Sequence, residues 1–185
     1  MPSGRSGGAM STSAERVLPD GSVARLRAVP YDDPLARTLV EAVQQEYVAR
    51  YGGRDEAVVD PAEFRPPAGL FLVAELDGAP AGCGAWRVHP PGGVEIKRVY
   101  VAAGFRRRGL AQAIMAELEC SAARAGHRSV VLNTGRRQPE AVALYADLGY
   151  VPVPGFGVYA CSPEAVFLGK ELAALTHGEE STWAS

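Results

Sequence analysis

Few of the residues that build disulfide-linked folds or metal centres occur in this sequence. The three cysteines (Cys83, Cys120 and Cys161) are odd in number and widely spaced, with no C-x-x-C motif. The three histidines form no cluster with the spacing of metal ligands. These features argue against a disulfide framework and a zinc site. We therefore expect free thiols, no bound metal, and a reducing, cytoplasmic location.

An excess of charge of either sign is also missing. The chain has 19 Lys and Arg residues against 21 Asp and Glu residues, so its formal net charge is −2. This balance argues against a dedicated nucleic-acid-binding protein. No apolar stretch reaches the roughly 18 residues of a membrane span, so we expect no membrane partner. The G-x-x-x-x-G-K-[ST] and G-x-G-x-x-G phosphate motifs are absent as well.

Composition and patterning predict one folded domain with a short extension at each end. The chain of 185 residues is 47% hydrophobic, which is sufficient for a single domain with a substantial core. Residues 1–21 begin with a Gly/Ser/Ala-rich stretch that lacks the apolar core of a secretory signal, and we expect them to be disordered. Residues 22–174 form the predicted domain, and residues 175–185 a flexible tail.

Hydrophobic periodicity predicts an α/β domain with a mixed sheet. Apolar stripes at helical spacing predict three helices, at residues 34–51, 110–125 and 139–148. Short apolar or alternating runs bounded by turn residues predict seven strands, at 23–29, 70–76, 79–88, 94–101, 129–133, 150–153 and 165–172. The three strands between 70 and 101 follow one another through tight turns and form an antiparallel meander. The 94–101 and 129–133 strands flank a helix, so a right-handed crossover makes them parallel.

The most informative segment is the basic turn Arg106-Arg107-Arg108-Gly109-Leu110-Ala111, which follows a strand and opens a helix. Free N–H groups and the partial positive charge at a helix N-terminus can hold a pyrophosphate. Gly109 and Ala111 put little or no side chain in the way of that ligand. The arginines add charge for further phosphates. The alternative is a solvated basic turn without a ligand.

Two motifs together resemble the GCN5-related N-acetyltransferase superfamily. Its phosphate motif [Q/R]-x-x-G-x-[G/A] is present as Arg106-x-x-Gly109-x-Ala111. Its second motif, N-x-x-A-x-x-L-Y-x-x-x-G-[F/Y], is present with Gln138 in place of the usual Asn and continues to Tyr150. The resemblance covers roughly residues 23–172. It implies a single GNAT-like domain in which the parallel 94–101 and 129–133 strands splay apart, with helices on the flanks.

The resemblance implies acetyl-CoA as the acetyl donor and an amine as the acceptor. In the family, the amides of the basic turn hold the pyrophosphate, and the pantetheine arm pairs with strand backbone in the gap between the splayed strands. A small-molecule acceptor is favoured over a protein, and a homodimer is common in the family. The cofactor-binding residues implied here are Val99, Tyr100, Val101, Arg106, Arg107, Arg108, Gly109, Leu110, Ala111, Gln112, Gln138 and Ala141.

Acetyl transfer to an amine requires a base for the ammonium proton and an acid for the departing thiolate. Glu95 is the candidate base, directly or through water, because the histone acetyltransferase branch has a glutamate at the same offset from the turn. A strand residue paired with Lys97 or Arg98 is the alternative. Tyr145 is the candidate acid, since the family's tyrosine at this position faces the CoA sulfur. A core aromatic residue is the alternative there.

Other residues leave more than one role open. Tyr47 and Tyr51 either line the acceptor pocket or continue the apolar stripe of the first helix. Arg98 and Tyr159 either bind an acidic group on the acceptor or serve ion pairing and packing. For the whole chain, a non-catalytic acyl-CoA-binding regulatory module and a nucleic-acid-binding protein are the rival functions, and the presence of both candidate catalytic residues argues against the first.

Overall fold

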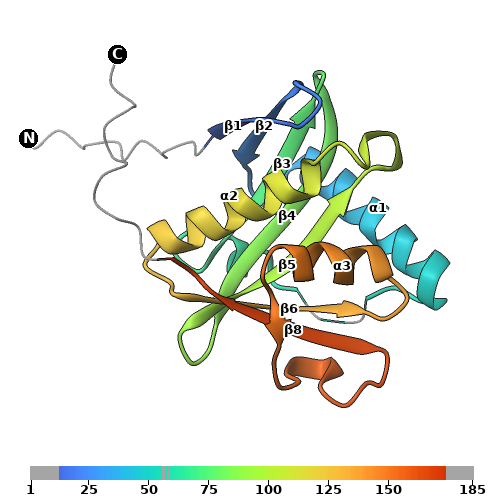
Figure 1. Ribbon diagram of the computed structural model, residues 1–185, viewed down its shortest axis with the longest axis vertical. Coiled ribbons are helices and arrows are strands. Elements are labelled where there is room, and N and C mark those ends of the chain that lie inside the picture. Colours follow the sequence, from blue (N-terminus) through green and yellow to red (C-terminus); the bar gives the residue numbers. More distant parts are fainter. Residues whose placement is uncertain (1–12, 56, 58, 174–185) are drawn as a thin grey trace, which may run out of the picture.

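An eight-stranded mixed sheet runs through the molecule (Figure 1). We analysed a computed structural model, which describes residues 13–55, 57 and 59–173. The strand order is β1-β2-β3-β4-β5-β6-β8-β7, and only the β5–β6 pair is parallel. The strands are β1 (Ser13–Val17), β2 (Val23–Ala28), β3 (Gly69–Leu76), β4 (Ala79–His89), β5 (Gly93–Val101), β6 (Ser129–Gly135), β7 (Val151–Pro152) and β8 (Ala165–Glu171).

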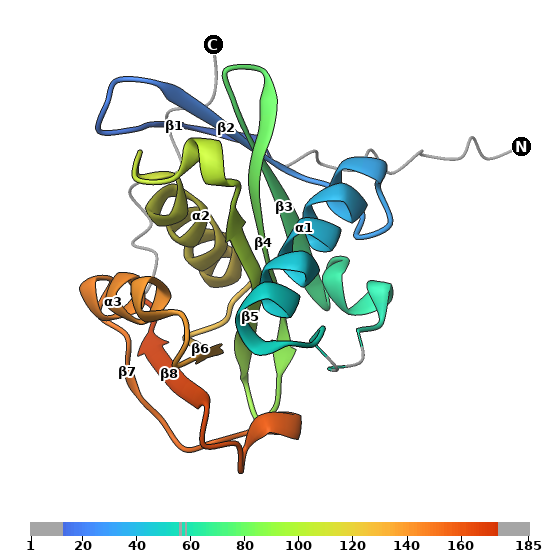
Figure 2. The ribbon, with the colours of Figure 1, turned by 90° about the vertical axis from the view of Figure 1, so that its right-hand side faces the viewer.

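Helices cover both faces of this sheet. Helix α1 (Pro34–Tyr51) packs on one face, and α2 (Leu110–Arg124) and α3 (Pro139–Asp147) pack on the other (Figure 2). Two apolar cores result, one between the sheet and α1 and a larger one beneath α2 and α3. None of the described helices is long and apolar enough to cross a membrane. The predicted α/β architecture, with an antiparallel meander and one parallel pair, is confirmed.

Local sequence explains where helix α1 begins and ends. The Asp33 side chain accepts a 2.8 Å hydrogen bond from the Leu35 amide, and Pro34 occupies the first helical position, where no N–H is needed. Gly52 ends the helix in the left-handed conformation (φ 80°) that glycine adopts without steric penalty. These are the signals from which the sequence predicted the helix.

Residues 13–21 belong to the segment predicted to be disordered, and here the structure differs from that expectation. Ser13–Val17 form strand β1, which pairs with β2 along its whole length. Arg16 also forms a 2.7 Å ion pair with Glu117 of α2, whose side chain is only 2% exposed. Backbone hydrogen bonds and this ion pair hold the strand in place. Its sequence has no alternation of apolar and polar residues, and periodicity therefore could not reveal it. Residues 1–12 and the predicted tail at 175–185 lie outside the described residues.

The end of the sheet also differs from expectation. The predicted 150–153 strand is reduced to β7, and β8 lies between it and β6. Proline at position 152 can donate no ladder hydrogen bond, which confines this short strand to the edge.

Candidate active site

Strands β5 and β6 pair over only three residues each and then part. The parallel ladder joins Val94–Ile96 to Val130–Leu132 and ends there. Opposite this point the β4–β5 register shifts, and Arg98 has a φ of 59°. Such a bulge bends the strand and frees its backbone groups from the ladder. The expected splay between these two strands is thus present, and the chain opens two cavities around it.

The turn after β5 presents a row of backbone amides. Arg107 (φ 60°) and Gly109 (φ 88°) are both left-handed, and Gly109 is the N-cap of α2. The first amides of α2, from Leu110 onward, have no carbonyl one turn earlier in the helix to bind. Left-handed residues next to a helix start form an anion-binding concavity. The geometry therefore suits a phosphate group.

A cavity of about 750 Å³ opens at this turn, and we call it the turn cavity. It lies between the basic turn, the second half of β5 and the start of α3. All twelve residues predicted to bind the cofactor line it: Val99, Tyr100, Val101, Arg106, Arg107, Arg108, Gly109, Leu110, Ala111, Gln112, Gln138 and Ala141. The structure also adds Pro19 and Asp20, from the turn between β1 and β2, to its wall. Sequence reasoning missed these two residues because they fall in the segment expected to be disordered.

Acidic residues hold two of the three arginines. Arg106 binds Glu46 of α1 at 2.5 Å, and Arg108 binds Asp20 at 2.7 Å and Asp77 at 3.2 Å. Arg107 is exposed and has no ion pair with any residue that the structure describes. Arg107 is therefore the arginine of the turn whose charge is not already matched by a carboxylate.

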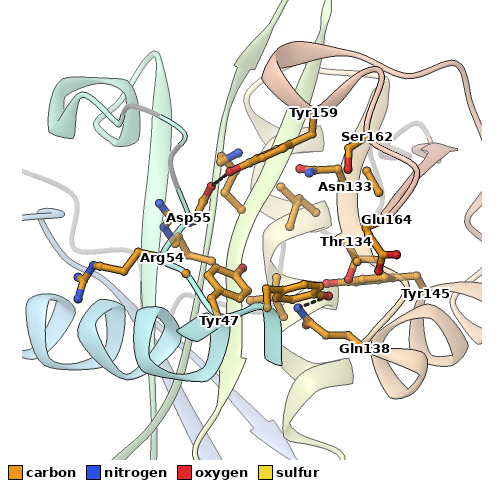
Figure 3. Close-up of a pocket in the computed structure, with 18 residues that line it drawn as sticks. Tyr47, Arg54, Asp55, Asn133, Thr134, Gln138, Tyr145, Tyr159, Ser162 and Glu164 are labelled. Atoms are coloured by element: carbon orange, nitrogen blue, oxygen red, sulfur yellow. Dashed lines mark hydrogen bonds and ion pairs between the residues drawn. The ribbon is translucent and has the colours of Figure 1, made fainter. Parts of the chain in front are cut away.

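A second cavity, of about 300 Å³, lies on the other side of the splayed strands (Figure 3). We call it the tyrosine cavity, because Tyr47, Tyr51, Tyr145 and Tyr159 are part of its wall. Tyr47 and Tyr51 come from the last turns of α1. Tyr47 also packs against the core between the sheet and α1, so it lines the cavity and continues the apolar stripe of the helix. The wall also includes Arg54, Asp55, Lys97, Arg98, Asn133, Thr134, Ser162 and Glu164.

Four residues line both cavities: Tyr47, Val99, Gln138 and Tyr145. Tyr145 is 7% exposed, and burial raises the pKa of its hydroxyl, so the group keeps its proton across the physiological range. Burial likewise raises the pKa of Tyr47 to about 12. A molecule in the turn cavity can therefore meet a molecule in the tyrosine cavity next to a protonated phenol.

A network of charged groups closes one end of the tyrosine cavity. The carboxylate of Asp55 accepts hydrogen bonds from Arg98, from the Tyr159 hydroxyl at 2.8 Å and from the Ala57 amide at 3.0 Å. Burial raises the pKa of Asp55, but the Arg98 charge and these hydrogen bonds outweigh it and hold the pKa below its ordinary value. Arg98 thus forms an internal ion pair with Asp55, and Tyr159 supports it by a hydrogen bond to the same carboxylate; ion pairing is the second of the two roles considered for these residues.

The structure does not bring Glu95 into either cavity. Its side chain is 5% exposed and binds Arg87 at 2.8 Å and Lys97 at 3.0 Å. Burial raises the pKa of Glu95, but the charges and hydrogen bonds of Lys97 and Arg87 lower it by more. The net effect is a pKa below the ordinary value of a glutamate. A buried carboxylate held by two cations is poorly placed to take a proton from an acceptor. This arrangement matches the alternative of a strand residue paired with Lys97.

Comparison with known proteins adds the family. The family model for the acetyltransferase (GNAT) family matches residues 35–150. The chain belongs to this family. An IAA acetyltransferase from Azospirillum brasilense is 29% identical over 156 residues, covering 84% of this chain and 100% of that protein.

Solved structures of GNAT proteins share the fold. The GNAT domain of S. lividans PAT superposes with a TM-score of 0.68 at 20% identity, covering 86% of this chain and 97% of that one. A GNAT family acetyltransferase from Elizabethkingia anophelis, solved with acetyl-CoA bound, has a TM-score of 0.59 at 16% identity, covering 80% and 98%. The protein is accordingly an acyltransferase, and GNAT proteins use acetyl-CoA. Among the described residues, no group of His, Cys, Asp or Glu side chains could hold a metal ion.

Proposed function

We propose that this GNAT protein transfers the acetyl group of acetyl-CoA to the primary amine of a small molecule, by direct attack in a ternary complex. The observation that carries the proposal is the pair of cavities that share Tyr145. Two substrates bound on either side of one protonated phenol need no covalent enzyme intermediate, because proximity alone joins them.

The turn cavity is the proposed site for acetyl-CoA. The amides that follow Arg107 and Gly109 would hold the pyrophosphate, and the bulged backbone around Val99 would pair with the pantetheine arm. A backbone N–H near Val99 would also polarise the acetyl carbonyl as an oxyanion hole. Support comes from the left-handed turn and from the twelve predicted residues that line this cavity.

Tyr145 is the proposed general acid. Its raised pKa keeps it protonated, so it can give a proton to the thiolate of CoA as the bond to the acetyl group breaks. The ammonium group is proposed to lose its proton to the bulk solvent through a water chain before the neutral amine attacks, rather than directly to Glu95, because Glu95 lines neither cavity. The size of the tyrosine cavity, about 300 Å³, supports a small-molecule acceptor, and Asp55 and Tyr159 are joined by a hydrogen bond in its wall.

The proposal includes a cytoplasmic location. Cys83, Cys120 and Cys161 are all free thiols, and Cys161 is exposed, which suits a reducing compartment. We propose no nucleic-acid partner, because the net charge is −2 and the arginines of the turn are largely matched by carboxylates.

Two measurements test this function in sequence. Calorimetric titration of the purified protein with acetyl-CoA should show saturable binding. A panel of primary amines should then release CoA thiol, detected with a thiol reagent, and yield N-acetyl products by mass spectrometry. A folded protein that binds no acetyl-CoA would refute the donor, and binding without transfer to any amine would favour the regulatory module instead.

A further inference from the structure

The charges that line the tyrosine cavity are not equally well matched. Three cations belong to its wall, and each has a close carboxylate partner. Lys97 binds Glu95 at 3.0 Å, Arg54 binds Glu41 through two hydrogen bonds of 2.7 and 2.9 Å, and Arg98 binds Asp55. These pairs leave little cationic charge to attract an anion into the cavity.

Two carboxylates, Asp55 and Glu164, line the same cavity, and they differ in how strongly other groups bind them. Asp55 is fully engaged by Arg98, Tyr159 and the Ala57 amide. Glu164 has one ion pair, to the Nε atom of Arg137 at 3.4 Å, and the side chains of both partners are more than half exposed, at 52% and 59%. Exposed pairs at such a distance contribute little. Glu164 is the charged group of this wall that keeps the most capacity to bind a ligand.

Backbone hydrogen bonds fix the position of the Glu164 main chain. Its carbonyl accepts a 2.8 Å hydrogen bond from the Arg136 amide, and the next residue, Ala165, pairs with Gly135 at the end of β6. The Tyr51 hydroxyl rests against Gly135, since a Cβ atom placed there would lie 1.8 Å from it. The backbone of Glu164 and the hydroxyl of Tyr51 therefore both lie close to the end of β6, and both residues line the cavity. Figure 3 shows Glu164 in this wall beside Thr134.

We propose that Glu164 binds the ammonium group of the acceptor and thereby selects cationic amines over neutral and anionic molecules. This inference rests on the proposed amine acetylation. An ammonium group is the form in which most primary amines arrive at pH 7. A carboxylate accepts its N–H groups in charge-assisted hydrogen bonds, and tyrosine rings favour a cation near their faces. Glu164 is thus a specificity-determining residue of the acceptor site.

The test measures binding rather than turnover, so that it does not depend on acetyl transfer. Three probes of similar shape differ in charge: 2-phenylethylammonium, 2-phenylethanol and phenylacetate. Each is titrated into the full-length protein in the presence of CoA, and binding is followed by NMR. We expect the ammonium probe to bind wild type about tenfold more tightly than the alcohol, as a charge-assisted hydrogen bond implies.

Variants assign that preference to one side chain. Glu164→Gln should weaken the binding of the ammonium probe about tenfold and leave the affinity for the alcohol unchanged. Glu171 is an exposed glutamate at the end of β8, the strand that Glu164 directly precedes, and it lines neither cavity. Glu171→Gln is therefore the matched control and should not change the binding of any probe. Arg137→Gln removes the competing cation and should leave ammonium binding at least as strong as in wild type.

Several outcomes would overturn the proposal. These are an ammonium probe that binds wild type no better than the alcohol, a preference for phenylacetate, or a Glu164→Gln protein that behaves like Glu171→Gln. Equal losses in Glu164→Gln and Arg137→Gln would also overturn it, because they would show that the ion pair only supports the loop. Absence of acetyl transfer, by contrast, would refute the proposed function and leave the binding preference standing.

Discussion

The hydroxyl of Tyr159 donates a 2.8 Å hydrogen bond to the carboxylate of Asp55, which lies 104 positions earlier in the chain. Asp55 follows helix α1, and Tyr159 ends the short 3-10 turn Gly157–Tyr159 before β8. The bond therefore joins two segments that approach the tyrosine cavity from opposite sides, as the dashed line in Figure 3 shows. Because Asp55 is also held by Arg98 in the middle of the sheet, the bridge has a fixed anchor.

Loss of this bridge should loosen the acceptor site without stopping the reaction. In Tyr159→Phe we expect the KM of an accepted amine to rise about fivefold, with kcat unchanged, because a net hydrogen bond contributes roughly 1 kcal/mol. Steady-state kinetics at saturating acetyl-CoA measure both constants. A fall in kcat at constant KM would instead mean that Tyr159 takes part in the chemical step.

Removal of the Tyr145 hydroxyl should slow the reaction itself. We expect Tyr145→Phe to lower kcat by about 100-fold, which is at the lower end of what general acid catalysis contributes. Its affinity for acetyl-CoA, measured by calorimetry, should stay within about twofold of wild type, because the ring remains in the wall.

Tyr150→Phe is the control for this experiment. Tyr150 packs against Tyr145 with ring centroids 5.7 Å apart, but its hydroxyl binds Glu119 and it lines neither cavity. Its loss should lower the free energy of unfolding by about 1 kcal/mol and leave kcat unchanged. Equal rates in the two variants would remove Tyr145 from the acid role.

A methyl group at Gly109 should disturb the donor site. Gly109 has a φ of 88°, and a Cβ atom there would lie 2.6 Å from Pro19, which lines the turn cavity. We expect Gly109→Ala to weaken acetyl-CoA binding at least about tenfold, a loss of 1.4 kcal/mol or more. Gly126→Ala is the matched control, since Gly126 has nearly the same φ (92°) and nothing within 4 Å of the added atom.

Both glycine variants should lose roughly 1–2 kcal/mol of stability, the penalty for an L-residue in the left-handed region. Only Gly109→Ala should lose affinity in the calorimeter. If Gly126→Ala loses as much, the effect comes from general destabilisation and the turn is not the donor site.

Arg107 should recognise a phosphate that lies outside the pyrophosphate cradle. It is the exposed arginine of the turn without an ion pair to a described residue, so its charge is available. We expect Arg107→Ala to weaken the binding of acetyl-CoA about threefold to fivefold, as for the loss of an exposed ion pair. The affinity for 3′-dephospho-acetyl-CoA should stay the same. Equal losses for both donors would assign Arg107 to another group of the ligand.

Glu95 should stabilise the fold above its pKa. Because the folded-state pKa is depressed below 4.5, its contribution is fully present above about pH 4.5 and declines as the pH falls toward the folded value. We expect Glu95→Gln to lower the free energy of unfolding at pH 7 by about 3–5 kcal/mol, since two cations lose their buried partner. The gap between variant and wild type should narrow below pH 4.5.

Denaturant unfolding between pH 3 and pH 8 measures this difference, with transfer kinetics recorded in parallel. A Glu95→Gln protein as stable as wild type but much slower in transfer would restore Glu95 as the catalytic base.

The sequence alone determined most of the fold, and it predicted the residues that line the turn cavity. Helix boundaries such as Pro34 and Gly52 follow from local chemistry, and the parallel pairing of β5 and β6 follows from the handedness of one crossover. The basic turn could be predicted as well, because the groups proposed to bind the ligand are the backbone amides of consecutive residues. A site made of residues that are adjacent in the sequence can be recognised as a sequence motif.

Tertiary structure decided everything that depends on distant residues meeting. Strand β1 exists because its backbone pairs with β2 and Arg16 reaches Glu117, neither of which leaves a periodic signal. The bridge from Asp55 to Tyr159 joins two segments that are 104 positions apart, and their order in the chain says nothing of their distance in space. The tyrosine cavity is therefore a product of packing, because its charged side chains find their partners only when distant segments fold together.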